Sequence, residues 1–242
     1  MRAVAVIPAR AGSKGLADKN ALRVAGVPMV VRAIGAVRSA GAAVERILVS
    51  TDSPAVSRLA LDAGAEVVER PGELAGDAAG VESAARHALR VVYPGGDFPE
   101  ATLVVQPNLP VWQPGIVAEV LERLARGDAT GAGTCHLVGQ RPEWMKKRDP
   151  HGCAVPFLPA KRIPIRRQDF PELCYFDGAV LAVLTEALMK SEGQKVSHLY
   201  WLGDRVAPVV RPEIYGLEVH SPEDVALAEV AIAWLEKAGY PR

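Results

Sequence analysis

Short apolar runs alternate with stretches of helical periodicity along most of the chain. The apolar runs predict buried strands over residues 3–7, 46–50, 66–69, 102–105, 130–137 and 178–183. Between them, apolar residues at helical spacing predict amphipathic helices over 30–37, 56–63, 81–92 and 116–124. Strand–helix alternation with short connections is typical of βαβ units. We therefore predict an α/β fold, a Rossmann-like three-layer sandwich with a mostly parallel sheet.

The predicted helices have recognisable ends. Glycine favours the left-handed conformation that ends a helix, and three predicted helices are followed by Gly41, Gly64 and Gly127. A last helix is predicted to begin at Ser221 as N-cap, with Pro222 in its first position and Asp224 three residues after the cap. Its apolar positions run to Leu235.

Residues 140–176 differ from the rest of the chain because they are dotted with prolines, basic and less periodic. They contain the basic groups Lys146-Lys147-Arg148, Lys161-Arg162 and Arg166-Arg167. No linker or repeat divides the sequence. We predict one domain over residues 1–242, with this segment inserted as a small basic arm.

Bulk composition excludes several classes of function. The chain has 28 basic and 28 acidic side chains in 242 residues and few aromatic ones, so neither nucleic acid nor a membrane is an expected partner. No segment approaches the length of an apolar membrane span. The cysteines Cys135, Cys153 and Cys174 form no C-x-x-C pair, which favours reduced thiols and a cytoplasmic protein.

The loop after the first predicted strand concentrates positive charge. Residues 7–15 read Ile-Pro-Ala-Arg-Ala-Gly-Ser-Lys-Gly, and the stretch closes with Asp18, Lys19 and Asn20. Backbone N–H groups and fixed cations at the carboxyl end of a strand suit a polyphosphate. Neither G-x-x-x-x-G-K-[ST] nor a strand followed by G-x-G-x-x-G occurs, so the sequence predicts a nucleotide loop of another kind.

Two other polar groups follow predicted strands directly. They are Thr51-Asp52 and Gln106-Pro107. In open parallel sheets, ligands bind at the carboxyl ends of the strands. We therefore expect these groups to converge with the loop on one edge of the sheet and to form a site there.

Several of these motifs together resemble the cytidylyltransferases that make CMP-activated sugar acids, the acylneuraminate and ketodeoxyoctonate (KDO) synthetases. The resemblance is carried in order by Pro8-Ala9-Arg10 through Lys19-Asn20, by 49–52, 69–77 and 105–107, and again by 177–179 and 221–224. It covers the first half of the chain well and weakens beyond about residue 110.

The resemblance and the charge of the loop together assign roles to residues. The expected catalytic cations, which would neutralise a transferred phosphoryl group, are Arg10, Lys14 and Lys19. The expected nucleotide-binding residues are Ala9, Ser13, Asn20, Arg70, Asp77 and Gln106. Alternatives stay open: the loop can be an ordinary basic surface loop, Arg70 a surface residue, Gln106 a strand-end cap, and Asp77 or Asp52 a helix cap.

The acceptor side departs from the family pattern. Sialic-acid enzymes place an arginine before Pro-Asn-Gly-Ala, where this chain has Tyr175-Phe176-Asp177-Gly178-Ala179. Lys146 matches a family lysine and, with Arg166 or Arg167, could compensate for the lost arginine. The expected acceptor-binding residues are Lys146, Arg166, Arg167, Tyr175 and Asp177. They predict a small anionic acceptor, while the alternative is a solvated basic arm.

The metal motif departs as well. The family's Asp-Ile-Asp-Thr motif, which binds magnesium, has its counterpart in Glu218-Val219-His220-Ser221. Glutamate is a hard oxygen ligand, whereas imidazole suits softer metals. We expect Glu218 and His220 to hold Mg²⁺ or Mn²⁺, with help from Asp177. The alternatives for His220 are a proton acceptor, an outer-shell group or a purely structural residue.

The sequence as a whole predicts a CTP-dependent cytidylyltransferase that forms a CMP-activated acidic sugar, such as CMP-N-acylneuraminate, and releases pyrophosphate. The expected partners are CTP, a small anionic acceptor and a second copy in a homodimer, which the family builds through its arm. The alternatives are transfer to a phosphonate or sugar phosphate, and a nucleotide-binding homologue without turnover.

Overall fold

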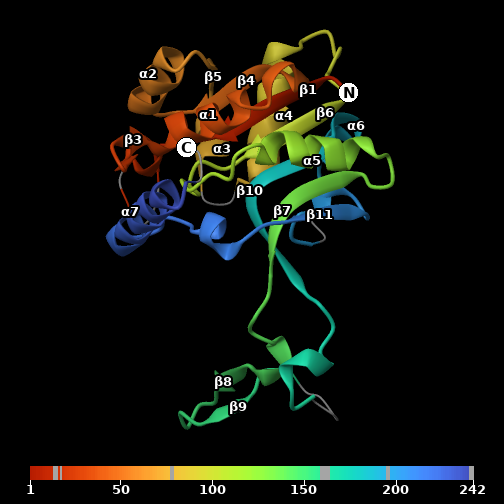
Figure 1. Cartoon of the computed structure of the whole chain (residues 1–242). Helices are drawn as coiled ribbons and strands as arrows, with labels where there is room; N and C mark the ends of the chain where they lie inside the picture. The colour runs from red at the N-terminus through yellow and green to blue at the C-terminus, as the bar shows by residue number, and fades with distance from the viewer. Residues whose placement is uncertain (13–15, 17, 77–78, 159–163, 195–196, 240–242) are drawn as a thin grey trace.

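A seven-stranded sheet forms the centre of the molecule in the computed structural model, which describes residues 1–12, 16, 18–76, 79–158, 164–194 and 197–239 (Figure 1). The strand order is β11-β7-β10-β6-β1-β4-β5. The bounds are β1 (Ala3–Pro8), β4 (Val44–Thr51), β5 (Glu66–Glu69), β6 (Ala101–Val105), β7 (Gly131–Leu137), β10 (Cys174–Leu184) and β11 (Val206–Val210). Strand β10 pairs antiparallel with β6 and β7, and the other pairs are parallel. The predicted mostly parallel sheet is confirmed.

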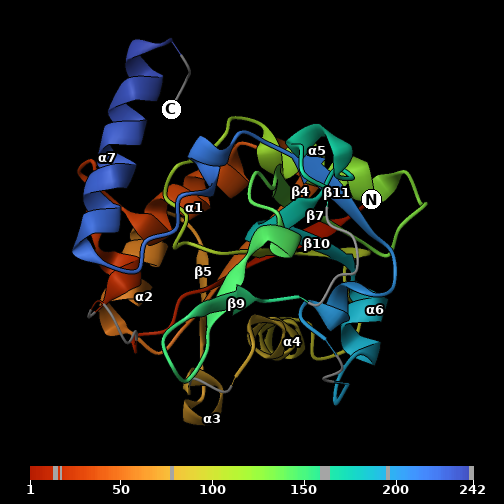
Figure 2. The same ribbon diagram turned by 90° about the horizontal axis from the view of Figure 1, so that it is seen from below.

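Helices cover both faces of the sheet (Figure 2). Alternate residues of β1 face opposite layers: Ile7 packs with α1, α2 and α5, and Val6 packs with α4 and α6. The bounds are α1 (Met29–Arg38), α2 (Pro54–Asp62), α3 (Gly72–Ala75), α4 (Val81–Val92), α5 (Ile116–Ala125), α6 (Thr185–Lys190) and α7 (Pro222–Lys237). Within the described ranges, no helix is both long and apolar enough for a membrane span.

The helix ends follow the expected chemistry. Gly41, Gly64 and Gly127 all have positive φ. The Ser221 hydroxyl accepts from the Asp224 N–H and the Asp224 carboxylate accepts from the Ser221 N–H, so the capping box of α7 is complete. The cap of α2 is Ser53, whose Oγ accepts from Val56 N at 3.3 Å. The alternative in which Asp52 caps this helix is therefore wrong.

Three small parts of the fold were not predicted from the hydrophobic pattern. Strand β11 contains Pro208, which lacks a backbone N–H and is tolerated because β11 is the edge strand. Helix α6 is only six residues long. The strands of two short hairpins are β2 (Arg23–Val24) with β3 (Val27–Pro28), and β8 (Lys146–Arg148) with β9 (Ala154–Pro156).

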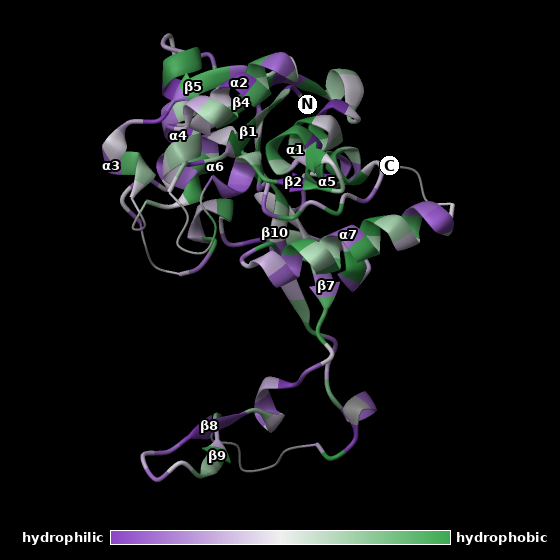
Figure 3. Ribbon diagram, turned by 90° about the vertical axis from the view of Figure 1, so that its left-hand side faces the viewer, coloured by the Kyte–Doolittle hydropathy of each residue, from purple (hydrophilic) through white to green (hydrophobic). Residues whose placement is uncertain are grey.

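The predicted arm projects from the body between β7 and β10 (Figure 1, Figure 3). Here the arm is residues 138–173, because β10 already begins at Cys174 and the expected limit of residue 176 lies inside that strand. The two ends of the arm are adjacent, since Leu137 and Cys174 are register partners. The arm exposes the apolar side chains of Trp144, Met145, Phe157, Leu158 and Ile165.

Candidate functional site

The carboxyl ends of the central strands meet at one edge of the sheet, as predicted. Strand β1 lies between β4 and β6, so the loop after β1 stands beside the segments that follow both neighbours. Ala9 N donates to Ser50 O at 2.9 Å, and Arg70 N donates to Thr51 O at 2.9 Å. The first bond joins the start of the loop to the end of β4, and the second joins the residue after β5 to the same end of β4.

A cavity of about 170 Å³ lies at this edge, and we call it the cationic compartment. Its wall brings together five of the predicted nucleotide-site residues with the turn before α4. Its lining residues are Pro8, Arg10, Lys19, Asn20, Arg70, Ala79, Gly80, Val81, Gln106, Pro107 and Asn108. Residues from four separate segments of the chain therefore converge as the sequence predicted. Ser13, Lys14 and Asp77 lie outside the described residues.

The two ends of the loop are fixed to the segment between β4 and α2. The Asp52 carboxylate accepts from Ala11 N at 2.7 Å, and Ser53 Oγ donates to Asp18 Oδ1 at 3.4 Å. Asn20, which is buried, donates from Nδ2 to Arg10 O at 3.0 Å. Asp52 thus acts on the loop, and Asn20 braces the backbone that carries Arg10.

Arg10 and Lys19, the two described cations of the loop, line the same cavity and influence each other's charge. Arg10 donates from Nη1 to Ala75 O at 2.9 Å, and it also lines the cationic compartment. Burial lowers the pKa of Lys19 and the neighbouring charge of Arg10 lowers it further, while the Glu218 carboxylate opposes this shift. Two cations held close together in a partly desolvated cavity are arranged to receive an anion.

Arg70 is a buried cation. Its Nε donates to Ser50 Oγ at 3.2 Å and its Nη2 donates to Ser50 O at 2.9 Å. Burial lowers the pKa of its guanidinium to about 10, so it is still cationic at neutral pH. The open alternative of a surface arginine is therefore wrong.

The Gln106 amide reaches the cavity because a glycine lies beside it. Gln106 N donates to Ala179 O at 3.0 Å, which fixes its backbone against β10. A Cβ at position 178 would lie 2.6 Å from Gln106 Nε2, and Gly178 has a φ of +78°. Only glycine satisfies both conditions without strain, so the Asp-Gly-Ala sequence of β10 supports the position of this amide.

A second cavity of about 440 Å³ adjoins the first, and we call it the aromatic compartment. It is lined by Tyr175, Phe176, Tyr200 and Trp201, together with polar groups that include Glu218. The two compartments share Gln106 and residues 79–81. The site therefore has room for two ligand groups that meet at Gln106.

The Asp177 carboxylate, at the edge of the aromatic compartment, is neutralised by a buried arginine. Arg211 donates from Nε to Asp177 Oδ2 at 2.8 Å, and both side chains are almost fully buried. Thr134 Oγ1 donates to Asp177 Oδ1 at 2.5 Å, and Ala179 N donates to the same oxygen at 3.0 Å. Because both side chains are buried and both carboxylate oxygens are engaged inside the protein, Asp177 forms an internal ion pair and does not offer the free carboxylate that the sequence suggested. Arg211 follows β11, a strand that was not predicted, and it was not among the expected site residues.

Glu218 and His220 contact each other at the border of the aromatic compartment. His220 Nε2 lies 2.7 Å from Glu218 Oε2, and Asn108 Nδ2 donates to the same oxygen at 3.5 Å. Among the described residues, no group of three or more histidine, cysteine or acidic side chains could hold a metal. One carboxylate beside a cationic compartment still fits Mg²⁺ where substrate phosphates bind, because Mg²⁺ takes most of its ligands from water and substrate phosphates.

The expected acceptor-binding residues divide between two places. Tyr175 lies on β10 and lines the aromatic compartment. Lys146 lies on β8 and Arg166 also belongs to the arm, which extends away from the sheet edge (Figure 3). The Arg166 guanidinium is paired with Asp169 at 3.0 Å. The side chain of Arg167 lies outside the described part of the structure. The arm residues therefore do not join the cleft of their own chain.

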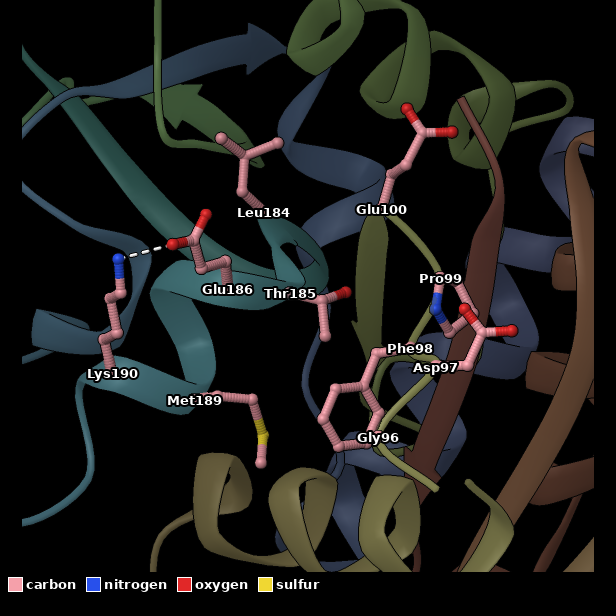
Figure 4. Close-up of a pocket in the computed structure, with 10 residues that line it drawn as sticks. All are labelled: Gly96, Asp97, Phe98, Pro99, Glu100, Leu184, Thr185, Glu186, Met189 and Lys190. Atoms are coloured by element: carbon pink, nitrogen blue, oxygen red, sulfur yellow. Dashed lines mark hydrogen bonds and ion pairs between the residues drawn. The ribbon is translucent and has the colours of Figure 1, made fainter. Parts of the chain in front are cut away.

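A larger cavity of about 730 Å³ lies at the opposite edge of the sheet (Figure 4). It is formed by residues 96–100, before β6, and by residues 184–190, after the end of the antiparallel strand β10. Phe98 and Met189 point into it, and Glu186 forms an ion pair with Lys190. None of the predicted site residues lines this cavity. The candidate site is therefore the cleft at the carboxyl edge.

The amino-acid sequence is similar to a protein-family model and to several characterised proteins. A sequence model described as cytidylyltransferase matches residues 4–99. The N-acylneuraminate cytidylyltransferase of Streptococcus agalactiae is 29% identical over 201 residues, which cover 83% of this chain and 48% of that protein. The CMP-N,N'-diacetyllegionaminic acid synthase of Legionella pneumophila is 31% identical over 156 residues, 64% of this chain and 66% of that one. The chain thus spans about half the length of the first of these relatives.

The fold also has a counterpart among solved structures. A CMP:2-keto-3-deoxy-manno-octonic acid synthetase complexed with CTP superposes with a TM-score of 0.67 at 19% identity, covering 98% of this chain and 100% of that one. At this level of identity the likeness establishes the fold. The shared fold therefore extends over nearly the whole chain.

Proposed function

We propose that this chain, which belongs to the family of cytidylyltransferases that includes the CMP-sugar-acid synthetases, transfers CMP from CTP to an acidic sugar and releases pyrophosphate. The relatives act on sugar acids according to their names, which supports this acceptor class. The observation that carries the proposal is the meeting of the cationic and aromatic compartments at Gln106. Two adjoining compartments suit a reaction in which a nucleotide and an acceptor meet.

CTP is assigned to the cationic compartment. Arg10 and Lys19 would face the triphosphate, with Lys14 and Ser13 from the same loop. An amide both donates and accepts, so Gln106 suits the edge of cytosine, and Arg70 would support the same end of the nucleotide. The acceptor would occupy the aromatic compartment, where Tyr175 lies.

The reaction is one displacement at phosphorus. An acceptor hydroxyl oxygen attacks the α-phosphorus of CTP, the new P–O bond forms, and the bond from phosphorus to the bridging oxygen of pyrophosphate breaks. The hydroxyl proton passes to solvent. Arg10 and Lys19 stabilise the charge that develops on the phosphoryl and leaving-group oxygens. His220 and Asn108 hold Glu218 in position.

Glu218 is the residue that would hold Mg²⁺ or Mn²⁺. When bound, the ion would neutralise phosphate charge and fix the geometry of the triphosphate. His220 contacts the Glu218 carboxylate and so serves as its positioning residue. Replacing Glu218 with glutamine would then weaken binding of Mn²⁺ in the presence of CTP, a change that paramagnetic relaxation of water protons reports without turnover.

The decisive experiment is pyrophosphate release from CTP and Mg²⁺ with a panel of acceptors: acylneuraminates, KDO, other nonulosonic acids, sugar phosphates and small phosphonates. ATP, GTP and UTP serve as controls. Release that requires CTP and a sugar acid is expected. Release with a phosphonate or sugar phosphate would replace the acceptor class. CTP binding without release on any acceptor, with Mg²⁺ or Mn²⁺, would indicate a binding homologue and contradict the proposal.

Replacing Gln106 with alanine is expected to raise the KM for CTP by about 5-fold, because a lost hydrogen bond to the base is worth about 1 kcal/mol. Selectivity for CTP over UTP should fall together with affinity. Gly178→Ala is the matched variant, since its new Cβ would displace the same amide without removing it. Unchanged kinetics with CTP and UTP in both variants would remove Gln106 from the nucleotide site.

We also propose that the arm joins two copies and carries Lys146 and Arg166 toward the aromatic compartment of the second copy. The support is that these cations stand away from their own cleft and that Phe157 and Ile165 expose apolar surface, Ile165 to 90%. Phe157→Glu with Ile165→Glu is expected to weaken dimers at least 10-fold in sedimentation and to raise the KM for the acceptor, not for CTP. Dimers of unchanged stability would place the contact elsewhere.

A further inference from the structure

Helix α7 is apolar on two sides. Its inner side is buried and carries Ala228, Ala231, Ile232 and Leu235, which pack in one cluster with Val24 and Met29. Its outer side exposes Leu227, Val230 and Trp234, with 58%, 68% and 56% of their surfaces accessible. A helix that only covers a domain has a polar outer side, so the outer apolar residues require a partner.

The outer residues follow the spacing of a helix–helix contact. Glu223, Leu227, Val230, Trp234 and Lys237 are separated by alternating steps of four and three residues. This spacing keeps one row of side chains facing a second helix. We call these five residues the outer seam. Figure 2 shows α7 at the margin of the body, and within the described chain no element lies over its outer side.

The outer seam is self-complementary. Val230 is at its centre, large apolar residues stand on both sides, and the ends carry opposite charges in Glu223 and Lys237. In an antiparallel pair of two such helices, Val230 meets Val230 on the symmetry axis, Leu227 meets Trp234, and each glutamate meets a lysine. A parallel pair would place like charges together at both ends.

We propose that the outer seam of α7 binds the outer seam of a second copy of this chain, antiparallel and across a two-fold axis. The pattern favours this occupant over the basic arm, because the arm would match Glu223 but would repel Lys237. Three large apolar side chains bury less than the ~800 Å² per partner of a standard interface. The contact is therefore expected to be weak alone and to add to any other interface between the copies.

Site-specific disulfide formation tests the geometry. In a chain with Cys153→Ser and Cys174→Ser, which removes the exposed thiols, Val230→Cys is expected to give a disulfide-linked dimer under mild oxidation. Leu227→Cys alone should crosslink at least 10-fold less, because its partner is Trp234, whereas Leu227→Cys with Trp234→Cys should crosslink. Equal crosslinking of the single variants at 227 and 230, or none at 230, would overturn the proposal.

Charge exchange tests the contact at equilibrium. Glu223→Lys and Lys237→Glu are each expected to weaken self-association several-fold in sedimentation, and the double variant should restore it. The measurement is repeated with Phe157→Glu and Ile165→Glu in the arm, which separates this contact from the proposed arm dimer. The pairing would be contradicted if the double variant associated as weakly as the single variants. It would also be contradicted if neither Glu223→Lys nor Lys237→Glu changed self-association. Thermal unfolding verifies that each variant is folded.

Discussion

Replacing Lys19 with alanine is expected to lower kcat for CMP transfer by about 10²–10³-fold, the usual cost of removing one preorganised charge from a transition state. Lys19 lies half-buried beside Arg10 in the cationic compartment, so water cannot replace its charge efficiently. Because the charge on the phosphate oxygens grows during transfer, kcat should fall more than KM rises. Steady-state kinetics with the sugar acid identified by pyrophosphate release gives both constants.

The pH dependence of the same residue gives an independent readout. Burial lowers the pKa of Lys19 below the ordinary 10.5, so its cationic form is lost as the pH rises through that lowered value. The kcat/KM of the free enzyme should therefore fall on the alkaline side below pH 10.5. Lys19→Arg keeps the charge at high pH and should move that decline to higher pH, where the buried Arg70, with a pKa of about 10, also loses its proton. A decline that stays at the same pH in Lys19→Arg would belong to another group.

The control for this series is Arg23→Ala. Arg23 is a nearby cation whose Nη1 donates to Gly26 O at 2.6 Å in an exposed turn. It lies outside both compartments. Its loss should leave kcat within about two-fold of wild type, since exposed charges are screened by solvent. A loss as large as that of Lys19→Ala would mean that general positive charge, and not the geometry of the loop, supports transfer.

Replacing Asp177 with alanine is expected to destabilise the fold by about 3–5 kcal/mol, because the Arg211 guanidinium would stay buried without its counter-charge. The thermal midpoint should fall by about 6–20 °C for a chain of this size. Calorimetry or a dye-based melt measures the shift. The double change Asp177→Ala with Arg211→Met should lose less stability than the two single losses together predict, since it removes both charges.

An exposed ion pair provides the matched comparison. Arg90 and Glu192 are paired at 3.0 Å, with about half of each side chain accessible. Glu192→Ala should cost less than about 1 kcal/mol, because solvent screens the pair. If Asp177→Ala and Glu192→Ala shift the midpoint equally, the buried pair does not carry the role assigned to it here.

The sequence predicted those parts of the fold that local pattern encodes. The run 3–7 has no polar residue because β1 is covered on both faces, so its apolar character is visible without any alignment. The loop after β1 was predictable for a related reason, since charged residues directly after a buried strand lie at the sheet edge. Ser13, Lys14, Asp77 and the side chain of Arg167 stay predictions.

Other features depend on contacts between distant parts of the chain. Asp177 and Arg211 are 34 positions apart, and the local sequence around either residue does not predict its contact with the other. Asp52 was expected at the same sheet edge as the loop, but its bond to the N–H of Ala11, 41 positions away, was not predicted. Strand β11 was missed because Pro208 masks the pattern of an edge strand. Side-chain contacts of this kind depend on how the strands are ordered in the sheet, which the local sequence does not predict.

The reversed direction of β10 has an evolutionary consequence. Because Leu137 and Cys174 are register partners, whatever chain is inserted between them leaves and re-enters the sheet at one point. Lengthening a closed loop costs little, since its entropy grows only with the logarithm of its length. A change in the length or sequence of the arm therefore need not disturb strands β1, β4 and β6, so the segment proposed to reach the acceptor can vary while the proposed nucleotide site is kept.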